Sequence, residues 1–196
     1  FSRRLAIAYL NRGVGRRTDG ARAAGRSVLD FIQAIGVLEH DQCAGLTDGP
    51  LLLAACWVNL ADAQASEHVE GAWRRAVGSA VHAKSLVAQF EGNDVAAAEI
   101  GVRARHVCCR ALARCASGSI ARGTVDADVH AATDAVDEAL DLIRQWERRG
   151  VTRFRSMAND FFRFGLGVYT RVQPHFVAEF VSDQRECANA WRVRGD

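Results

Sequence analysis

Four thiol and imidazole side chains lie close together in the sequence and could bind a metal ion. They are His106, Cys108, Cys109 and Cys115. Structural zinc sites usually need ligands at loop spacings, such as two Cys-x-x-Cys pairs, and the sequence lacks this spacing. Cys108 and Cys115 are seven residues apart, which places both on one face of a helix. We therefore expect buried structural thiols and no metal site.

The side chains that could support catalysis form no known catalytic pattern. No nucleophile-elbow glycine pattern surrounds any of the six histidines, and His82 and His130 fall on amphipathic stretches where a surface or boundary position is expected. A group of acids near the start of one stretch is more typical of a solvated face than of a carboxylate pair. This acidic group is Asp134, Asp137, Glu138 and Asp141. The sequence predicts no catalytic or cofactor-binding residue and hence no enzyme.

Two short motifs match known binding signals without their structural context. Residues 11–17, Asn-Arg-Gly-Val-Gly-Arg-Arg, contain glycines but lack the Lys-Ser/Thr ending and the preceding strand of a phosphate-binding loop. Arg194-Gly195-Asp196 matches an integrin-binding tripeptide, which three residues form readily by chance. Neither motif is expected to bind a ligand.

The composition indicates an all-helical protein with a core of its own. Of the 196 residues 49% are hydrophobic, alanine dominates this fraction, and only two prolines interrupt the chain. These features favour close-packed helices over sheets. The longest nearly uncharged apolar run, residues 51–60, is about half the length that crosses a bilayer, so we expect no membrane span.

Charge and cysteine content bear on partners and compartment. The formal charge is only +2, with both signs spread along the chain, which predicts no strong attraction to nucleic acid. Six cysteines would suit disulfides in a small secreted protein, but a chain of this size folds without them, and reduced buried thiols are expected. Residues 1–18 carry arginines and no acid. They are compatible with an organellar transit segment, and equally with a truncated chain.

Glycines, prolines and capping residues divide the chain into about seven helical segments. The first is expected to stop near Gly13–Gly15, the fourth at Gly92, and the fifth before a loop at Ser117-Gly118-Ser119. The predicted helices are residues 2–11, 21–38, 50–65, 69–90, 94–115, 128–149 and 151–172, followed by a last helix at 174–191. Short connections between amphipathic helices make neighbours antiparallel.

Two of these helices carry detailed predictions. The apolar face of the second is predicted to consist of Val28, Leu29, Phe31, Ile32, Ile35 and Leu38. The sixth has apolar residues at three-and-four spacing, which places them on one buried face. They are Ala132, Ala135, Val136, Ala139, Leu142, Ile143 and Trp146. The region from residue 151 onward is dense in aromatics, namely Phe154, Phe161, Phe162, Phe164 and Tyr169.

Residues 136–151 have the sequence Val-Asp-Glu-Ala-Leu-Asp-Leu-Ile-Arg-Gln-Trp-Glu-Arg-Arg-Gly-Val. This segment resembles the second helix and exit turn of a pentatricopeptide repeat. Ala139-Leu140, Trp146 and Gly150-Val151 occupy the family's alanine-leucine pair, large apolar residue and closing glycine. The family's usual proline is absent, and Arg153 stands near its place. A weaker likeness to the tetratricopeptide pattern involves Trp57, Leu60, Ala61, Ala76, Ala80 and Ala83.

The resemblance implies one helical domain over residues 1–196, built as a short stack of degenerate helix hairpins. Residues 1–20 could be an extended or transit-derived segment before the first hairpin. A plain helical bundle is the alternative. Among small pentatricopeptide-like proteins, the chain looks most like the helical accessory subunit on the catalytic head of euglenozoan mitochondrial ATP synthase. That likeness implies a matrix location, protein partners, no small-molecule substrate and a non-catalytic role.

The second functional hypothesis is an organellar RNA-binding pentatricopeptide protein. The alignment puts Asn159 at about the base-reading position of the repeat after Gly150. A local basic patch could assist, and it consists of Arg144, Arg148, Arg149, Arg153 and Arg155. One convincing repeat reads only about one base, and a near-neutral chain releases few counterions from a phosphate backbone. Protein partners are therefore favoured over RNA.

Overall fold

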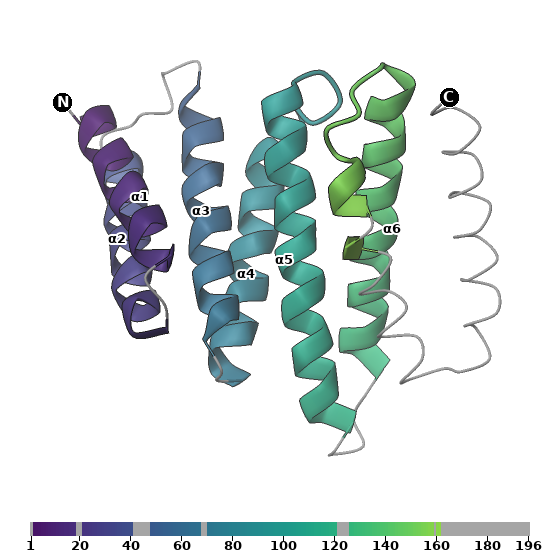
Figure 1. Ribbon diagram of the computed structural model, residues 1–196, viewed down its shortest axis with the longest axis horizontal. Coiled ribbons are helices and arrows are strands. Elements are labelled where there is room, and N and C mark those ends of the chain that lie inside the picture. Colours follow the sequence, from purple (N-terminus) through teal and green to yellow (C-terminus); the bar gives the residue numbers. More distant parts are fainter. Residues whose placement is uncertain are drawn as a thin grey trace.

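A computed structural model describes residues 2–18, 21–40, 48–67, 70–120, 126–158 and 160–161 of the chain. The described residues form helices and turns and include no strand, which confirms the all-α prediction (Figure 1). The labelled helices are α1 (Ser2–Thr18), α2 (Ala21–His40), α3 (Gly49–Ser66), α4 (Glu70–Val87), α5 (Val95–Ile120) and α6 (Asp126–Arg148).

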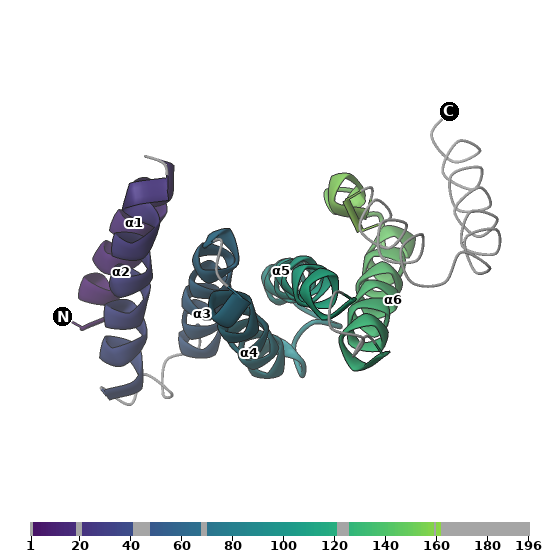
Figure 2. The same ribbon diagram turned by 90° about the horizontal axis from the view of Figure 1, so that it is seen from below.

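The helices stand side by side in chain order, and each packs against the next (Figure 1). Seen along the helices of the central part, α3 and α5 lie in one layer and α4 and α6 in the other (Figure 2). Helix α3 also packs directly against α5, its next-but-one neighbour. A surface spanning two helix pairs therefore forms where α3 and α5 meet.

Helix α6 shows how the sequence pattern produces the packing. Its predicted apolar stripe is confirmed, because Ala139 and Ile143 are fully buried, and Val136, Leu142 and Trp146 are also buried. Phe154 and Phe161, from the segment that follows, pack into the same core cluster. Three-and-four spacing puts these side chains on one face, and the acids of α6 are left on the other.

Small side chains allow the central helices to approach closely. In α3, the buried residues lie all round the helix, because α2, α4 and α5 surround it. Alanines make up much of this contact, and Ala61, Ala65, Ala76, Ala80 and Ala111 belong to one cluster shared by α3, α4 and α5. Pro50 lies in the first turn of α3, as predicted.

The prediction that the first helix stops near Gly13–Gly15 is wrong, because α1 continues to Thr18. Residues 2–18 are consequently not an extended segment. A Cβ atom added at Gly13 would lie 2.5 Å from Cε1 of Phe31, a fully buried side chain of α2. Glycine at this position lets α1 and α2 approach each other closely, so it serves packing and does not terminate the helix.

Two further boundary predictions and one burial prediction also need correction. Helix α4 ends at Val87, and residues 88–93 form turns, so Gly92 does not stop the helix. Helix α5 reaches Ile120 and includes the residues predicted as a loop at 117–119. In α2, Leu29 is 61% exposed and Ile32 is 46% exposed, so neither belongs to the buried face. Burial there follows Phe31, Ile35 and Leu38, which pack against α1 and α3.

The exit turn of α6 confirms the predicted role of Gly150. This glycine has φ of 84°, a left-handed conformation that side chains with a Cβ rarely adopt. Its N–H donates to the carbonyl of Glu147 at 2.9 Å, and the N–H of Val151 donates to the carbonyl of Trp146 at 3.0 Å. This pair of bonds is a Schellman motif, and Val151 packs in the same cluster as Trp146, as that motif favours.

Several predictions fall on residues that the structure does not describe. They concern Asn159, Phe162, Phe164, Tyr169, Pro174 and the proposed helix at 174–191, which all lie outside the described residues. Of the predicted helix at 151–172, residues 155–158 and 160–161 are helical. Among the described residues, no helix combines the length and apolarity that crossing a membrane requires.

Candidate functional site

The cysteines considered for metal binding are structural thiols. Cys108 and Cys109 on α5 and Cys56 on α3 are buried free thiols, and Cys115 on α5 is buried as well, which confirms the predicted burial of these four. Cys43 and Cys187 lie outside the described residues. Burial raises the pKa of the Cys108 thiol to about 11 and that of Cys56 to about 12. In the described part of the chain, no group of three or more His, Cys, Asp or Glu side chains is placed to hold a metal ion.

The predicted surface positions of the histidines and acids are confirmed. His82 and His130 are exposed, and so are the acids at 134, 137, 138 and 141. Glu138, however, is more than a solvated side chain. Its Oε2 accepts hydrogen bonds from Nζ of Lys84 at 2.8 Å and from Nε of Arg105 at 3.1 Å. Burial opposes ionisation, but these two bonds outweigh it and lower the pKa of Glu138.

Arg105 connects Glu138 to a buried carboxylate. Its Nη1 and Nη2 donate to Oε1 and Oε2 of Glu91 at 2.7 and 3.1 Å, and both side chains are about nine-tenths buried. Burial opposes the charged form of Arg105, yet the two carboxylates raise its pKa. Because Glu91 follows α4 and Arg105 belongs to α5, this network fixes the α4–α5 turn against α5 and α6.

The Glu91 carboxylate occupies space that a glycine leaves free. A Cβ atom on Gly101 would lie 1.8 Å from Oε1 of Glu91. Gly101 stands inside α5, where glycine costs roughly 0.5–1 kcal/mol relative to alanine. The cost is offset by the bidentate ion pair that the absence of a side chain permits. The hydrogen-bond network of Glu91, Arg105 and Glu138 therefore has a structural role.

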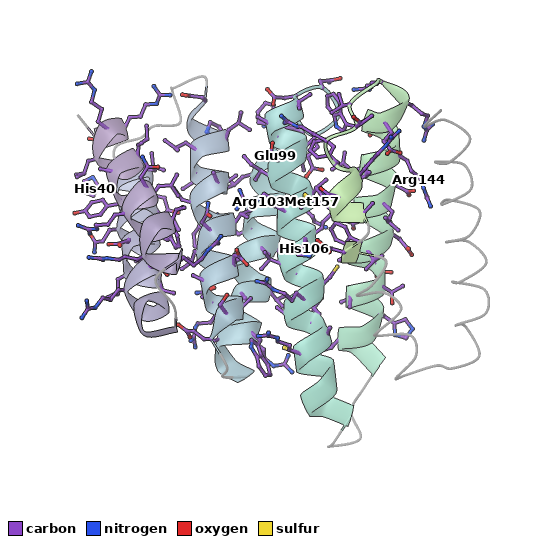
Figure 3. All side chains as sticks on the ribbon, in the orientation of Figure 1. His40, Glu99, Arg103, His106, Arg144 and Met157 are labelled. Carbon is purple, nitrogen blue, oxygen red and sulfur yellow. The ribbon has the colours of Figure 1, made fainter. Side chains whose placement is uncertain are left out.

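A second group of polar side chains lies where α3 meets α5, and we call it the α3–α5 polar face. It consists of Asn59 and Asp62 on α3 and of Glu99, Arg103, His106, Arg110 and Arg114 on α5. The α5 members are spaced by four, three, four and four residues and therefore share one side of the helix. All five are partly buried, although Nε2 of His106 and Nε of Arg110 are shielded from solvent. Figure 3 shows Glu99, Arg103 and His106 one below another along α5, with Met157 beside them.

The α3–α5 polar face is connected by hydrogen bonds between helices. Asp62 accepts from the guanidinium groups of Arg110 on α5 and of Arg17 on α1. Nη2 of Arg103 donates to Oδ1 of Asn59 at 3.3 Å. These bonds cross from one helix pair to the next, so the side chains keep a defined spacing along the array.

The two ends of the face differ. At one end, Glu99 is paired at 2.9 Å with Arg153, which lies beyond α6. At the other end, Nη1 of Arg114 donates to the carbonyl of Ala65 at 2.7 Å, and its guanidinium lies 5.6 Å from the Trp73 ring centroid. Among the described residues, positive charge is therefore balanced by a carboxylate at the Glu99 end but not at the Arg114 end.

His106 occupies the middle of the face. Its ring meets the Phe161 ring edge-on, with centroids 5.4 Å apart. Burial and the positive charge of Arg110 lower its pKa, against the opposing effects of Asp160 and Asp62. The imidazole is therefore neutral over a wider pH range than a free histidine.

The local basic patch predicted from sequence is largely neutralised within the chain. Arg144 pairs with Asp141 at 3.0 Å, Arg155 with Glu147 at 2.9 Å, and Arg153 with Glu99. Arg149 donates to the carbonyl of Gly92 and lies over the Trp146 ring at 5.1 Å. Arg148 remains exposed beside a shallow depression that Glu91, Arg105 and Glu138 line. These arginines do not form a continuous positive surface.

Sequence reasoning missed the α3–α5 polar face. The spacing of residues 99, 103, 106, 110 and 114 was a usable signal, since it marks a polar stripe within a largely apolar helix. The sequence does not indicate that Asp62 and Asn59, more than forty residues earlier, accept the hydrogen bonds of Arg110 and Arg103. Only the packing of α3 on α5 determines that pairing.

Comparisons with known proteins leave the chain without a family assignment. No family model, no curated protein and no solved structure matches it. The likeness to pentatricopeptide and tetratricopeptide repeats therefore stays a prediction from the residues that carry it.

Proposed function

We propose that this chain is a non-catalytic, protein-binding subunit of a larger assembly. The observation that carries the proposal is the α3–α5 polar face. Its side chains are partly buried and are held at fixed spacing by bonds between helices. Such a preorganised face loses little side-chain entropy when it meets a partner, which favours recognition by contact.

The charge pattern favours a protein partner over RNA. A surface that grips RNA presents continuous positive charge and exposed aromatic rings on which bases stack. On the α3–α5 polar face, carboxylates lie among the arginines, with Asp62 between Arg17 and Arg110 and Glu99 beside Arg153. The neighbouring Phe161 ring is fully buried. Mixed charges at defined positions suit a protein surface.

A finer proposal follows from the sequence resemblance. The stack of helix pairs would be a short array of degenerate pentatricopeptide-like repeats, and the assembly would be organellar. The catalytic head of mitochondrial ATP synthase is the first candidate, with the chain as an accessory subunit on the matrix side. The alanine-leucine pair, Trp146 and the Gly150 turn support this proposal, since they have the packing roles that the motif requires.

The test is cross-linking in native organelles. A photoreactive amino acid replaces His106 on the proposed contact face or, as a control, Val81, which is 49% exposed on α4. We expect a full-length chain in a particle far larger than 21.3 kDa, with protein cross-links formed from position 106 and not from position 81. Cross-links to subunits of the ATP synthase head would support the finer proposal. A chain that sediments alone, or that cross-links to RNA, contradicts the protein-binding function.

A further inference from the structure

We propose that the α5 side of the α3–α5 polar face binds an extended acidic segment of the partner protein. This inference rests on the proposed function and adds the chemistry of the contact. It is argued from the arginines of the face, from the partners that they have within the chain, and from their spacing.

Cations outnumber anions around the centre of the face. Arg17 and Arg110 share the single carboxylate of Asp62. Arg103 has only the neutral amide oxygen of Asn59 as a polar partner among the described residues, and Arg114 has a backbone carbonyl and an aromatic ring. Four guanidinium groups thus lie near two carboxylates, those of Asp62 and of Asp160 beside His106, while Glu99 at the end is already neutralised by Arg153.

These guanidinium groups retain donors that a ligand could use. Guanidinium carries five N–H donors in a fixed planar arrangement that suits carboxylate. Arg103 makes one hydrogen bond, at 3.3 Å, so most of its N–H donors are unused within the described part of the chain. The side chains of Arg17 and Arg110 are 31% and 25% exposed, so they border solvent while much of their surface is shielded from it. Charge-assisted bonds are stronger in such partly shielded positions.

The spacing of the arginines matches an extended chain. Along α5, Arg103 and Arg110 are separated by about 10 Å, and Arg110 and Arg114 by about 6 Å, at 1.5 Å per residue. An extended peptide advances about 3.3 Å per residue. Side chains at alternate positions share one face of an extended chain and recur about every 6.6 Å. Four acidic side chains at alternate positions therefore cover about 20 Å and can lie opposite the roughly 16 Å stretch from Arg103 to Arg114. The sequence class recognised is a short extended segment with this acidic spacing.

The experiment uses the full chain and a labelled probe peptide. The probe has ten residues, with glutamates at its second, fourth, sixth and eighth positions and alanine, glycine and serine elsewhere. A second peptide has glutamine in place of each glutamate, and a labelled ten-nucleotide RNA is a third probe. Binding is measured by fluorescence anisotropy at low and at physiological salt.

The matched variants are Arg103→Glu on the α3–α5 polar face and Arg148→Glu on α6. Arg148 is exposed and lies beside the depression lined by Glu91, Arg105 and Glu138, not on the α3–α5 polar face. Both change the net charge by the same amount. We expect the glutamate peptide to bind the native chain, the glutamine peptide to bind at least tenfold more weakly, and Arg103→Glu to weaken glutamate-peptide binding by roughly tenfold or more. Arg148→Glu should change that affinity by less than twofold. Arg103→Gln replaces Arg103→Glu if circular dichroism shows that the charge reversal disturbs the fold.

The other outcomes overturn the inference. Equal weakening by both charge reversals would show nonspecific attraction. Absence of glutamate-peptide binding, or tighter binding of the RNA, would contradict an acidic-peptide site. The proposed function is tested separately, because cross-links from position 106 that persist in an Arg103→Glu chain leave the protein-binding role intact and exclude only the acidic contact.

Discussion

At the scale of single residues, the buried pair of Glu91 and Arg105 depends on Gly101. Replacement of Gly101 by alanine places a methyl group on the Glu91 carboxylate, at 1.8 Å from Oε1. The carboxylate must move away, and Arg105 then loses its bidentate partner inside the protein. Arg105 keeps its hydrogen bond to Glu138, and loss of a hydrogen bond to a charged group costs about 1.5–3 kcal/mol. We expect Gly101→Ala to lower the free energy of unfolding by an amount in that range, measured by urea denaturation followed by circular dichroism.

Gly78 provides the control for this substitution. It lies inside α4, is exposed, and has no atom within 4 Å of an added Cβ. Gly78→Ala should raise the free energy of unfolding by roughly 0.5–1 kcal/mol, since alanine has the higher helix propensity. If the two variants were equally stable, the proposed role of Gly101 would be wrong.

His106 predicts a pH dependence of stability. Burial and Arg110 lower its pKa in the folded chain below the ordinary value of 6.5. The unfolded chain therefore takes up a proton first as the pH falls, and the stability that neutral His106 contributes is present above about pH 6.5 and is lost below it. One proton gives a slope of at most about 1.4 kcal/mol per pH unit.

The measurement is urea denaturation of the native chain and of His106→Gln from pH 7.5 to pH 5. We expect stability of the native chain to fall over this range and the slope to be smaller in the variant. The charged groups that act on His106 are Arg110, Asp62 and Asp160, and all three are the same in both proteins. Identical slopes would exclude His106 as the titrating group.

At the scale of helices, Trp146 joins the end of α6 to the turn before α5. The side chain is 5% exposed, and its Nε1 donates to the carbonyl of Glu91 at 2.9 Å. Trp146→Ala removes a large buried ring and should lower the free energy of unfolding by about 3–5 kcal/mol. Trp146→Phe retains much of the packing, and loss of the hydrogen bond should cost about 1–3 kcal/mol. Both values come from denaturation, and an unchanged Trp146→Ala midpoint contradicts the assigned packing.

The sequence predictions for the helices are right where a residue's role is local and wrong where it depends on a neighbouring helix. Gly150 was read correctly, because a glycine after a run of periodic apolar residues usually adopts the left-handed turn. The prediction of a helix end near Gly13 is wrong, since the local sequence does not reveal that Phe31 of another helix packs against this glycine. Leu29 and Ile32 were misread because apolar character does not say which face a neighbouring helix covers.

At the scale of the whole molecule, the balance of charges predicts weak RNA binding. The chain carries 25 basic and 23 acidic residues, and the arginines of the local patch largely meet carboxylates or carbonyls within the chain. We expect no binding of labelled organellar RNA tighter than about micromolar at physiological salt. Titration followed by anisotropy measures this. Tight, sequence-selective binding that Asn159→Ala weakens would instead favour the RNA-binding alternative.

The all-helical class and the α6 core could be predicted at this scale, whereas the candidate site could not. Helix periodicity is a local property that each segment shows by itself. The α3–α5 polar face unites Arg17, Asp62 and Arg110 from three helices. Its existence depends on the contact of α3 with its next-but-one neighbour, which no single segment encodes.

The turn between α4 and α5 depends on residues that the ribosome adds much later. The carbonyls of Glu91, Gly92 and Val95 accept hydrogen bonds from Trp146, Arg149 and Arg153, which follow them by 55, 57 and 58 residues. A nascent chain that ends before Trp146 lacks these three donors. The turn acquires its final contacts only after α6 has emerged and the chain has reversed at Gly150. We therefore expect the α4–α5 turn and the end of α6 to open together, as one cooperative unit.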